Sequence, residues 1–350
     1  MMNGKIESIQ FLRFVAATLV ALFHSTLAIE KFFAGNLPPL FLRISNLGAA
    51  GVDIFFVISG FIMIITSFSD SREPFSPRRF LARRAIRIYP IYFIYSAFYL
   101  VFYDLFATGK DVSLLQVLGS LFLLPGFSSY IIGPGWTLSF EIYFYACFAV
   151  AMMFGLRNGI LALSLFFFLA VASSFVVHSD NSLIHVMTSN LLLEFLLGAW
   201  IAYAILSKRQ FSSAVAIAAV FGACVWFLAS LLFLHSPALL RWGIPSALLV
   251  CGLASLEKNT RLPSIVSKCS FLGDSSYSLY LLHILLIDVF IFLAIYFDAT
   301  IASHIKLIGS IGTMTLCLAI TAYCVLVAVF SYDMLERRVI TYFKKVLRAT

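Results

Sequence analysis

Ten long apolar segments, separated by short polar ones, constrain the fold of this chain more than any other feature. Apolar residues make up 62% of its 350 residues, charged residues make up 11%, and the mean hydropathy is +1.00. A water-soluble domain cannot bury so much apolar surface, whereas lipid can cover it. In lipid the backbone must satisfy its own hydrogen bonds, which segments of about 20 residues do as α-helices. The sequence therefore predicts an all-α polytopic membrane protein.

The predicted helices form a single membrane domain over residues 1–350. They are expected near residues 8–28, 48–68, 86–106, 138–155, 159–177, 190–206, 213–234, 240–256, 275–297 and 305–331. A further apolar run, 113–126, is too short to span a bilayer and ends in Pro125-Gly126. We interpret it as a re-entrant or interfacial segment.

The distribution of lysine and arginine orients the bundle. With the N-terminus in the cytoplasm, 18 of the 24 Lys and Arg residues fall in inner segments, 5 fall in outer segments, and Arg13 lies within a span. Cytoplasmic loops of membrane proteins carry this excess of positive charge. We therefore expect both termini in the cytoplasm, and we interpret the net charge of +8 as topology rather than nucleic-acid binding.

The sequence does not predict a metal site or a bound nucleotide cofactor. The six cysteines are scattered, mostly within apolar runs, and they lack the spacing of zinc ligands or of a disulfide framework. The glycines form neither a Walker loop nor a dinucleotide-binding loop, and no G-x-S-x-G elbow is present. We expect the cysteines to serve packing.

Arg13 and His24 are the most informative polar residues inside a predicted span. They are eleven residues apart. That spacing is close to three helical turns and puts both side chains on one helix face, about 16 Å apart along the axis. Ionisable residues in lipid are costly and usually mark a function. The pair predicts an anion anchor at one depth and a proton-handling group at another.

A histidine–carboxylate centre is expected at the outer side of the bundle. Asp53 opens the second predicted span and Glu141 the fourth, at the side where the first span places His24. A carboxylate beside a histidine fixes its tautomer and stabilises the imidazolium, as in a general base. Each residue alone would more often be a polar contact between helices, but three ionisable groups at one depth favour a function.

Arginines cluster before the third predicted span, in SPRRFLARRAIRIYPIY. Arg84 and Arg87 are one turn apart on one face, where two guanidinium groups suit a phosphate or diphosphate ligand. Topology and contact with lipid headgroups account for such arginines equally well. Arg13 either contacts the same ligand or pairs with a buried acid such as Glu194.

The segments that hold these residues resemble the membrane acyltransferase-3 family. The likeness runs from IQFLRFVAATLVALFH through GVDIFFVISGFIM, RRFLARRAIRIYPIY and GPGWTLSFEIYFY to SYSLYLLH. The R-x10-H pattern at Arg13 and His24 and the R-x-x-R pattern at Arg84 and Arg87 match signatures of that family. The segment GVDIFFVISGFIM and the compact length are most similar to the branch that acetylates bacterial exopolysaccharide such as succinoglycan.

The resemblance implies transfer of an acyl group, usually acetyl, from cytoplasmic acyl-coenzyme A to a sugar hydroxyl, in a bacterial inner membrane. It implies that His24 is catalytic, that Glu141 is an acidic residue of a family motif, and that Arg84 and Arg87 are needed for activity. Acetyl-CoA would then be a donor substrate, and no cofactor would be bound permanently. The acceptor would be a polysaccharide or a lipid-linked oligosaccharide, with membrane lipids and polysaccharide assembly proteins as further partners.

Four residues are second-tier candidates. His283 and Tyr277 lie in the ninth predicted span, where His283 could face the same interior as Arg13, although a lone histidine is more often a packed core residue. Ser139 and Trp136 lie near the start of the fourth span. Trp136 could stack on a sugar ring, although aromatic residues also form the membrane belt and the core.

The chain departs from the family's pattern in two places. Many relatives carry a periplasmic SGNH hydrolase-like domain after the membrane part, and we expect none here. If the acyl group must be handed on, a separate protein would do it. Relatives often have a Glu-Pro pair in the last span. Here Glu336 is followed by Arg337, which leaves the role of Glu336 open.

The sequence leaves two mechanisms and two other functions open. His24 acts as a base on a sugar hydroxyl, oriented by Glu141 or Asp53, or it carries the acyl group, acetyl or succinyl, as a transient acyl-histidine. A saccharide transporter would need a polar path and a repeat symmetry that the sequence does not show. A non-catalytic partner of a polysaccharide assembly complex would support acetylation even after His24→Ala.

Overall fold

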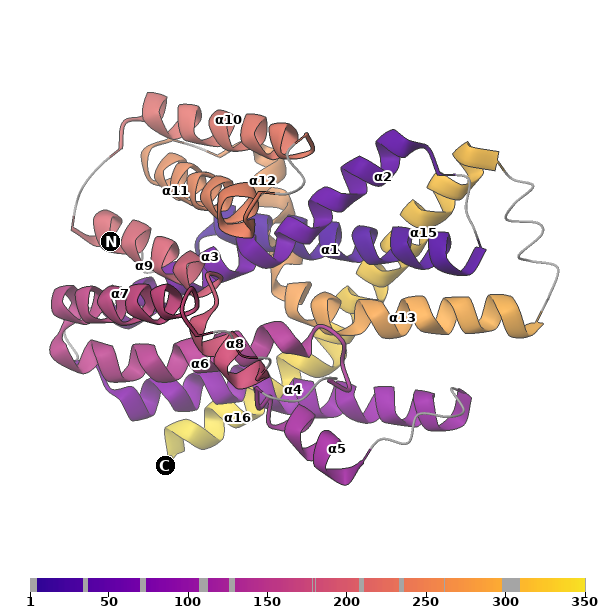
Figure 1. Ribbon diagram of the computed structural model, residues 1–350, viewed down its shortest axis with the longest axis horizontal. Coiled ribbons are helices and arrows are strands. Elements are labelled where there is room, and N and C mark those ends of the chain that lie inside the picture. Colours follow the sequence, from indigo (N-terminus) through magenta and orange to yellow (C-terminus); the bar gives the residue numbers. More distant parts are fainter. Residues whose placement is uncertain are drawn as a thin grey trace.

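The computed structural model describes residues 5–33, 37–69, 74–106, 113–125, 130–177, 179, 181–207, 211–232, 236–260, 262–297 and 309–349. Every regular element in these ranges is helical, and ten helices are long and apolar enough to cross a membrane, which confirms the predicted fold class. Figure 1 shows most of them aligned along one direction, with both marked chain ends on its left-hand side. The chain is a multi-pass membrane protein.

The elements differ in length and kind. The ten long helices are α1 (Glu7–Phe33), α3 (Ala50–Phe68), α4 (Pro77–Phe106), α6 (Gly135–Ala151), α7 (Leu156–Ser173), α9 (Leu192–Leu206), α10 (Ser213–Ser230), α11 (Ile244–Asn259), α13 (Ser276–Phe297) and α15 (Gly309–Ser331). The other helices are α2 (Pro39–Ser45), α5 (Leu114–Leu121), α8 (Ser182–Thr188), α12 (Ser264–Cys269) and α16 (Arg337–Ala349). The 3-10 turns are η1 (Asn46–Ala49), η2 (Met152–Phe154) and η4 (Ser270–Ser275), and the π turns are η3 (Leu239–Gly243) and η5 (Tyr332–Glu336).

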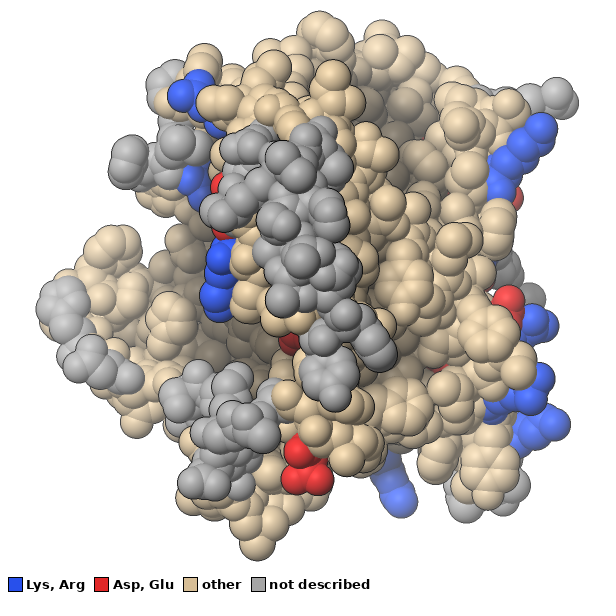
Figure 2. All heavy atoms as spheres, turned by 90° about the vertical axis from the view of Figure 1, so that its right-hand side faces the viewer, with Lys and Arg blue, Asp and Glu red and all other residues tan. Residues whose placement is uncertain are grey.

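The surface of the bundle is largely apolar. Figure 2 views the end that lies on the right in Figure 1, and charged side chains are scattered singly or in small groups over this face. Along the bundle many large apolar side chains point outward, among them Leu165, Phe168 and Leu326, each at least 59% exposed. Lipid can cover such side chains, so their exposure fits the membrane assignment.

The run 113–126 contains the short helix α5. Its eight residues extend about 12 Å, far less than the hydrocarbon thickness of about 30 Å. Ser113 and Gln116 cap its first turn reciprocally, and Tyr92 of α4 donates to the carbonyl oxygen of Ser120 at 3.1 Å. α5 is therefore a short helix attached to α4. Residue 126 lies outside the described residues, so the re-entrant interpretation stays a prediction.

α4 begins at Pro77, well before the range 86–106 that hydropathy predicts. Proline fits the first helical turn because the amide that it lacks has no acceptor there. The arginines, leucine and alanines that follow are strong helix formers, so the charged segment continues into the apolar one as a single helix. Arg84 and Arg87 are therefore helical residues at one end of a span.

A carboxylate from another helix holds the start of α1. Glu257 of α11 accepts hydrogen bonds from the backbone nitrogens of Glu7 and Ser8, both at 2.9 Å, and from the Ser8 hydroxyl at 2.6 Å. The first amides of a helix lack internal acceptors and carry partial positive charge, so they favour a carboxylate. This contact fixes the depth of α1 relative to α11.

Buried tyrosines on one face of α4 bond to α13. The Tyr95 hydroxyl lies 2.8 Å from Ser278 Oγ. The Tyr99 hydroxyl donates to the Leu281 carbonyl oxygen and accepts from the Leu285 amide, both at 2.9 Å. A hydroxyl in an apolar interior needs such partners. These bonds hold α13 in a fixed register against α4.

α3 and α9 cross in close contact at two glycines. A Cβ added at Gly60 would lie 1.9 Å from the Phe195 carbonyl oxygen, and one added at Gly198 would lie 1.9 Å from the Val57 carbonyl oxygen. Small residues let membrane helices approach this closely. The crossing fixes the position of α3, which contributes to both cavities described below.

We expect Gly60→Ala to destabilise the protein, because the added methyl group has no space and overpacking typically costs about 1–3 kcal/mol. The measurement is the melting temperature of the purified protein in detergent. Gly222→Ala in α10 is the matched control, because nothing lies within 4 Å of its added Cβ. Alanine there should preserve or raise the melting temperature, since it is the better helix former. Equal melting temperatures for the two variants would contradict the close crossing.

Candidate active site

Two cavities lie along the bundle at successive depths. The first, which we call the arginine cavity, has about 840 Å³ of empty space, part of it open to solvent, and its polar lining is Arg13, Ser59, Arg84, Arg87, Thr137, Glu141, Tyr145, Ser276, Tyr277 and Tyr280. The second, the histidine cavity, has about 1100 Å³ measured in the same way, and its lining includes Phe23, His24, Asp53, Pro134, Trp136, Trp242 and Tyr280.

The same helices line both cavities at different heights. On α1, Arg13 faces the arginine cavity and His24 faces the histidine cavity. On α6, Trp136 lines the histidine cavity, and Glu141, more than one turn further along, lines the arginine cavity. The spacing of Arg13 and His24, about 16 Å along α1, therefore measures the offset between the two cavities.

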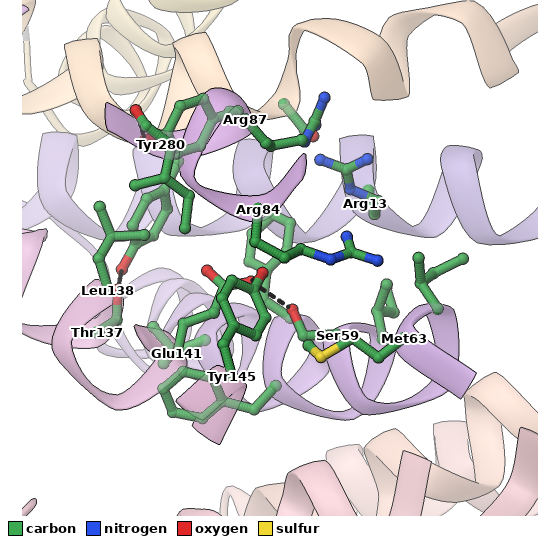
Figure 3. A pocket seen from close by; sticks show the side chains of 18 residues that line it. Arg13, Ser59, Met63, Arg84, Arg87, Thr137, Leu138, Glu141, Tyr145 and Tyr280 are labelled. Atoms are coloured by element: carbon green, nitrogen blue, oxygen red, sulfur yellow. Dashed lines mark hydrogen bonds between the residues drawn. The ribbon is translucent and has the colours of Figure 1, made fainter. Parts of the chain in front are cut away.

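Val52 and Tyr280 line both cavities and so form the wall between them. Tyr280 is buried, and its hydroxyl lies 2.8 Å from Thr137 Oγ1. Its ring packs edge-on against Phe55 with the centroids 5.7 Å apart. Figure 3 shows Tyr280 and Thr137 across the arginine cavity from the Arg13 guanidinium.

Arg13, Arg84 and Arg87 converge in the arginine cavity (Figure 3). Arg13 Nη1 lies 3.4 Å from Gln10 Oε1, and Arg84 Nη2 donates to Thr66 Oγ1 at 2.8 Å. Among the described residues, neither Arg13 nor Arg84 forms an ion pair with a carboxylate. Guanidinium groups without an ion-pair partner favour an anion with several oxygens, and the anion site stays a prediction.

Arg87 forms an ion pair with Glu336. This carboxylate is fully buried and belongs to the π turn η5, a kind of irregularity often found at functional sites. Its Oε1 lies 3.9 Å from Arg87 Nη1, and its Oε2 accepts a hydrogen bond of 2.6 Å from Ser278. The role that the sequence leaves open for Glu336 is therefore, at least in part, to orient Arg87.

Glu141 lies among the arginines, in a different cavity from His24. Its Oε1 accepts hydrogen bonds from Ser59, at 3.0 Å, and from Tyr145. The Tyr145 ring lies under the Arg84 guanidinium, 5.7 Å from centroid to Cζ. The expectation that Glu141 shares the depth of His24 is therefore wrong. It fails because Glu141 is nearly two turns into α6, whereas Asp53 is in the first turn of α3.

Asp53 lines the histidine cavity together with His24, and its ionisable neighbour is the carboxyl group of Glu194 of α9. Both side chains are buried, and the positive charge of Arg241 acts on Asp53. Two buried carboxyl groups side by side do not both ionise, because like charges repel. Glu194, which the sequence offers as a partner for Arg13, instead adjoins Asp53 of α3.

The partner of His24 is a second histidine. Nδ1 of His24 lies 3.0 Å from the Val20 carbonyl oxygen and 3.2 Å from Nε2 of His283, and the ring centroids are 4.9 Å apart. His283 is fully buried in α13, and its own Nδ1 lies 3.2 Å from the Leu279 carbonyl oxygen. Within the described part of the chain, no carboxylate is hydrogen-bonded to His24.

The other second-tier candidates have different positions. Tyr277 lines the arginine cavity and donates to the Ile88 carbonyl oxygen at 3.0 Å. Trp136 lines the histidine cavity and is 43% exposed. Ser139 lines neither cavity and donates to the Leu123 carbonyl oxygen at 2.9 Å, which suits a structural contact. In the ranges that the structure describes, no three His, Cys, Asp or Glu residues are grouped to hold a metal ion.

The sequence does not predict that Ser59, Tyr145 and Tyr280 line the arginine cavity. They are uncharged residues inside apolar spans, where hydroxyl and aromatic side chains are common, so no charge signal distinguishes them. Tyr145 alone carries a signal, because it follows Glu141 by four residues and such pairs are neighbours on a helix.

Known proteins provide a family assignment. A family described as "Acyltransferase domain" matches residues 6–333. The chain is 37% identical over 254 residues to the exopolysaccharide production protein ExoZ of Rhizobium meliloti (strain 1021), covering 70% of this chain and 78% of that protein. It is 28% identical over 160 residues to the acyltransferase MdmB of Streptomyces mycarofaciens, covering 41% and 38% of the two chains. No solved structure matches the chain.

The closeness of Asp53 in α3 and Glu194 in α9 can be tested by substitution. Glu194→Gln should change the free energy of unfolding by less than about 1 kcal/mol, because the amide keeps the size of the carboxyl group and can donate to the neighbouring Asp53. Glu194→Leu should cost about 1–3 kcal/mol, because it leaves a buried carboxyl group without that partner. Thermal melting of the two purified variants measures the difference, and a leucine variant as stable as the glutamine variant would refute the pairing.

Proposed function

Because the chain belongs to the acyltransferase-3 family, we propose that it is an O-acetyltransferase of the bacterial inner membrane. The donor is cytoplasmic acetyl-CoA, and the acceptor is a hydroxyl of a surface or secreted polysaccharide or of its lipid-linked precursor. The enzyme class, an acyltransferase in a multi-pass membrane protein, follows from the family and the fold. The name of the Rhizobium relative, an exopolysaccharide production protein, supports the acceptor class.

One observation carries the proposal: three arginines and a histidine line adjoining cavities along the same helices. Acyl-CoA has phosphate groups at one end and its thioester at the tip of a long pantetheine arm. Arg13, Arg84 and Arg87 suit the phosphates. The offset of about 16 Å from Arg13 to His24 is comparable to the reach of the arm.

The donor enters from the cytoplasm and binds in the arginine cavity. For the thioester to reach His24, the side chain of Tyr280 has to release Thr137 and turn out of the wall. The sugar occupies the histidine cavity, where the exposed ring of Trp136 offers a stacking surface. This arrangement keeps the donor head group and the acceptor on separate sides of the reacting bond.

His24 acts as the general base. A ring nitrogen of His24 takes the proton of the sugar hydroxyl while the hydroxyl oxygen forms its bond to the acyl carbon. The carbon–sulfur bond then breaks, and the departing CoA thiolate takes the proton. Acylation of His24 itself before the sugar arrives is the alternative path through the same residue.

The two carboxylates keep proposed roles that differ from each other. Asp53 lines the histidine cavity with His24, and it is the acid best placed to orient His24 during transfer to the sugar. Glu141 lies in the arginine cavity, where it lowers the repulsion among the guanidinium groups when no donor is bound.

His24→Ala should abolish most acetylation, because general-base catalysis contributes about 10²–10⁴-fold to a rate. The measurement is the acetyl content of surface and secreted polysaccharide, by mass spectrometry, at matched expression. His185→Ala is the control, because His185 is exposed and lines neither cavity. Normal acetyl content in the His24 variant would favour a non-catalytic partner role instead.

Arg84→Ala should weaken binding of coenzyme A by about tenfold or more, because a charge-assisted hydrogen bond contributes about 1.5–3 kcal/mol. Calorimetric titration of the purified protein with coenzyme A measures the affinity. Arg83→Ala is the matched control, because this neighbouring arginine is exposed and does not line the cavity. If both variants bind with the wild-type affinity, Arg84 does not hold the donor.

A further inference from the structure

The two histidine rings face backbone carbonyl oxygens in the same way. Nδ1 of His24 lies 3.0 Å from the Val20 carbonyl oxygen, and Nδ1 of His283 lies 3.2 Å from the Leu279 carbonyl oxygen. A carbonyl oxygen can only accept, so both Nδ1 atoms carry a proton. In neutral rings both Nε2 atoms then keep a lone pair.

This assignment gives the contact between the rings a direction. Nε2 of His283 lies 3.2 Å from Nδ1 of His24, so His24 donates and His283 accepts. The proton on His24 Nδ1 is shared between the Val20 carbonyl oxygen and the His283 ring. Nε2 of His24 has no hydrogen-bond partner among the described residues, and His24 lines the histidine cavity, so this nitrogen is the one available to a ligand.

The scaffold around His283 holds its ring in place. The Tyr99 hydroxyl bonds to the Leu281 carbonyl oxygen and to the Leu285 amide, the two groups that an uninterrupted helix would pair across the turn containing His283. The His283 ring also packs against Tyr280, with the centroids 6.0 Å apart. His283 is fully buried, so its orientation is set by the bundle rather than by solvent.

The chemistry of the pair suits an apolar interior. A carboxylate beside the base would bring a negative charge into a low-dielectric region, at a cost of several kcal/mol before any compensation. A neutral imidazole accepts the same proton without that cost. When His24 takes a second proton at Nε2, its Nδ1–H bond to His283 becomes charge-assisted and stronger.

We propose that His283 is the positioning residue of His24: it accepts the Nδ1 proton, directs Nε2 into the histidine cavity, and stabilises the imidazolium that forms during transfer. The inference rests on the proposed function, because it assigns His24 as the base. It gives His283 the position that a carboxylate holds in many histidine-base sites.

Two substitutions separate this role from a packing role. His283→Leu fills the site but removes the acceptor, and it should lower kcat for acetyl transfer by about 10²-fold or more, with the KM for acetyl-CoA unchanged, because the donor binds in the other cavity. In His283→Gln the side-chain amide oxygen can accept the Nδ1 proton, so kcat should recover to within about tenfold of the wild type. The assay uses purified protein, acetyl-CoA and chemically deacetylated polysaccharide, and only variants that melt like the wild type are compared.

A double variant tests whether His283 acts through His24. His24→Ala with His283→Leu should be no slower than His24→Ala alone, since residues that act as a unit are non-additive. Equal rates for His283→Leu and His283→Gln, or additive losses in the double variant, would overturn the inference. If His24→Ala itself retains full activity, the proposed base fails instead, so the two failures are distinguishable.

Discussion

Lipid offers no hydrogen-bond partner, so each polar group inside this bundle has to be satisfied by another part of the same chain. Several buried polar groups meet this constraint through contacts between segments far apart in the sequence. Glu257 binds the start of α1, and Glu336 contacts both Arg87 and Ser278. The polar contacts that hold the helices together therefore also position the groups of both cavities.

α1 joins these arrangements because it contributes to both cavities. Its start is fixed by α11, and further along it meets α13 through the two histidines. α4 reaches the other side of α13 through its tyrosines, and it carries two of the three arginines of the arginine cavity. A shift of α13 along its axis would therefore disturb both the arginine cavity and the contact between the two histidines.

The sequence predicts those features that depend on local order. Hydropathy shows how many spans there are, and helical periodicity puts Arg13 and His24 on one face, because neither needs knowledge of a neighbour. The depth of Glu141 is mispredicted because depth depends on where α6 begins, at Gly135, and hydropathy does not mark that residue. The pairing of His24 with His283 lies beyond such reasoning, since 259 residues separate them and only packing brings them together.

The wall of Val52 and Tyr280 bears on the electrical insulation of the membrane. In the proposed reaction the donor comes from one side of the membrane and the acceptor from the other, so an open path between the cavities would let water in and protons run down their gradient. A narrow apolar constriction excludes water even when it is short. Valine and a buried tyrosine, its hydroxyl occupied by Thr137, provide such a constriction between the two cavities. A long acyl arm that fills the opening as it passes would keep the bilayer energised during turnover.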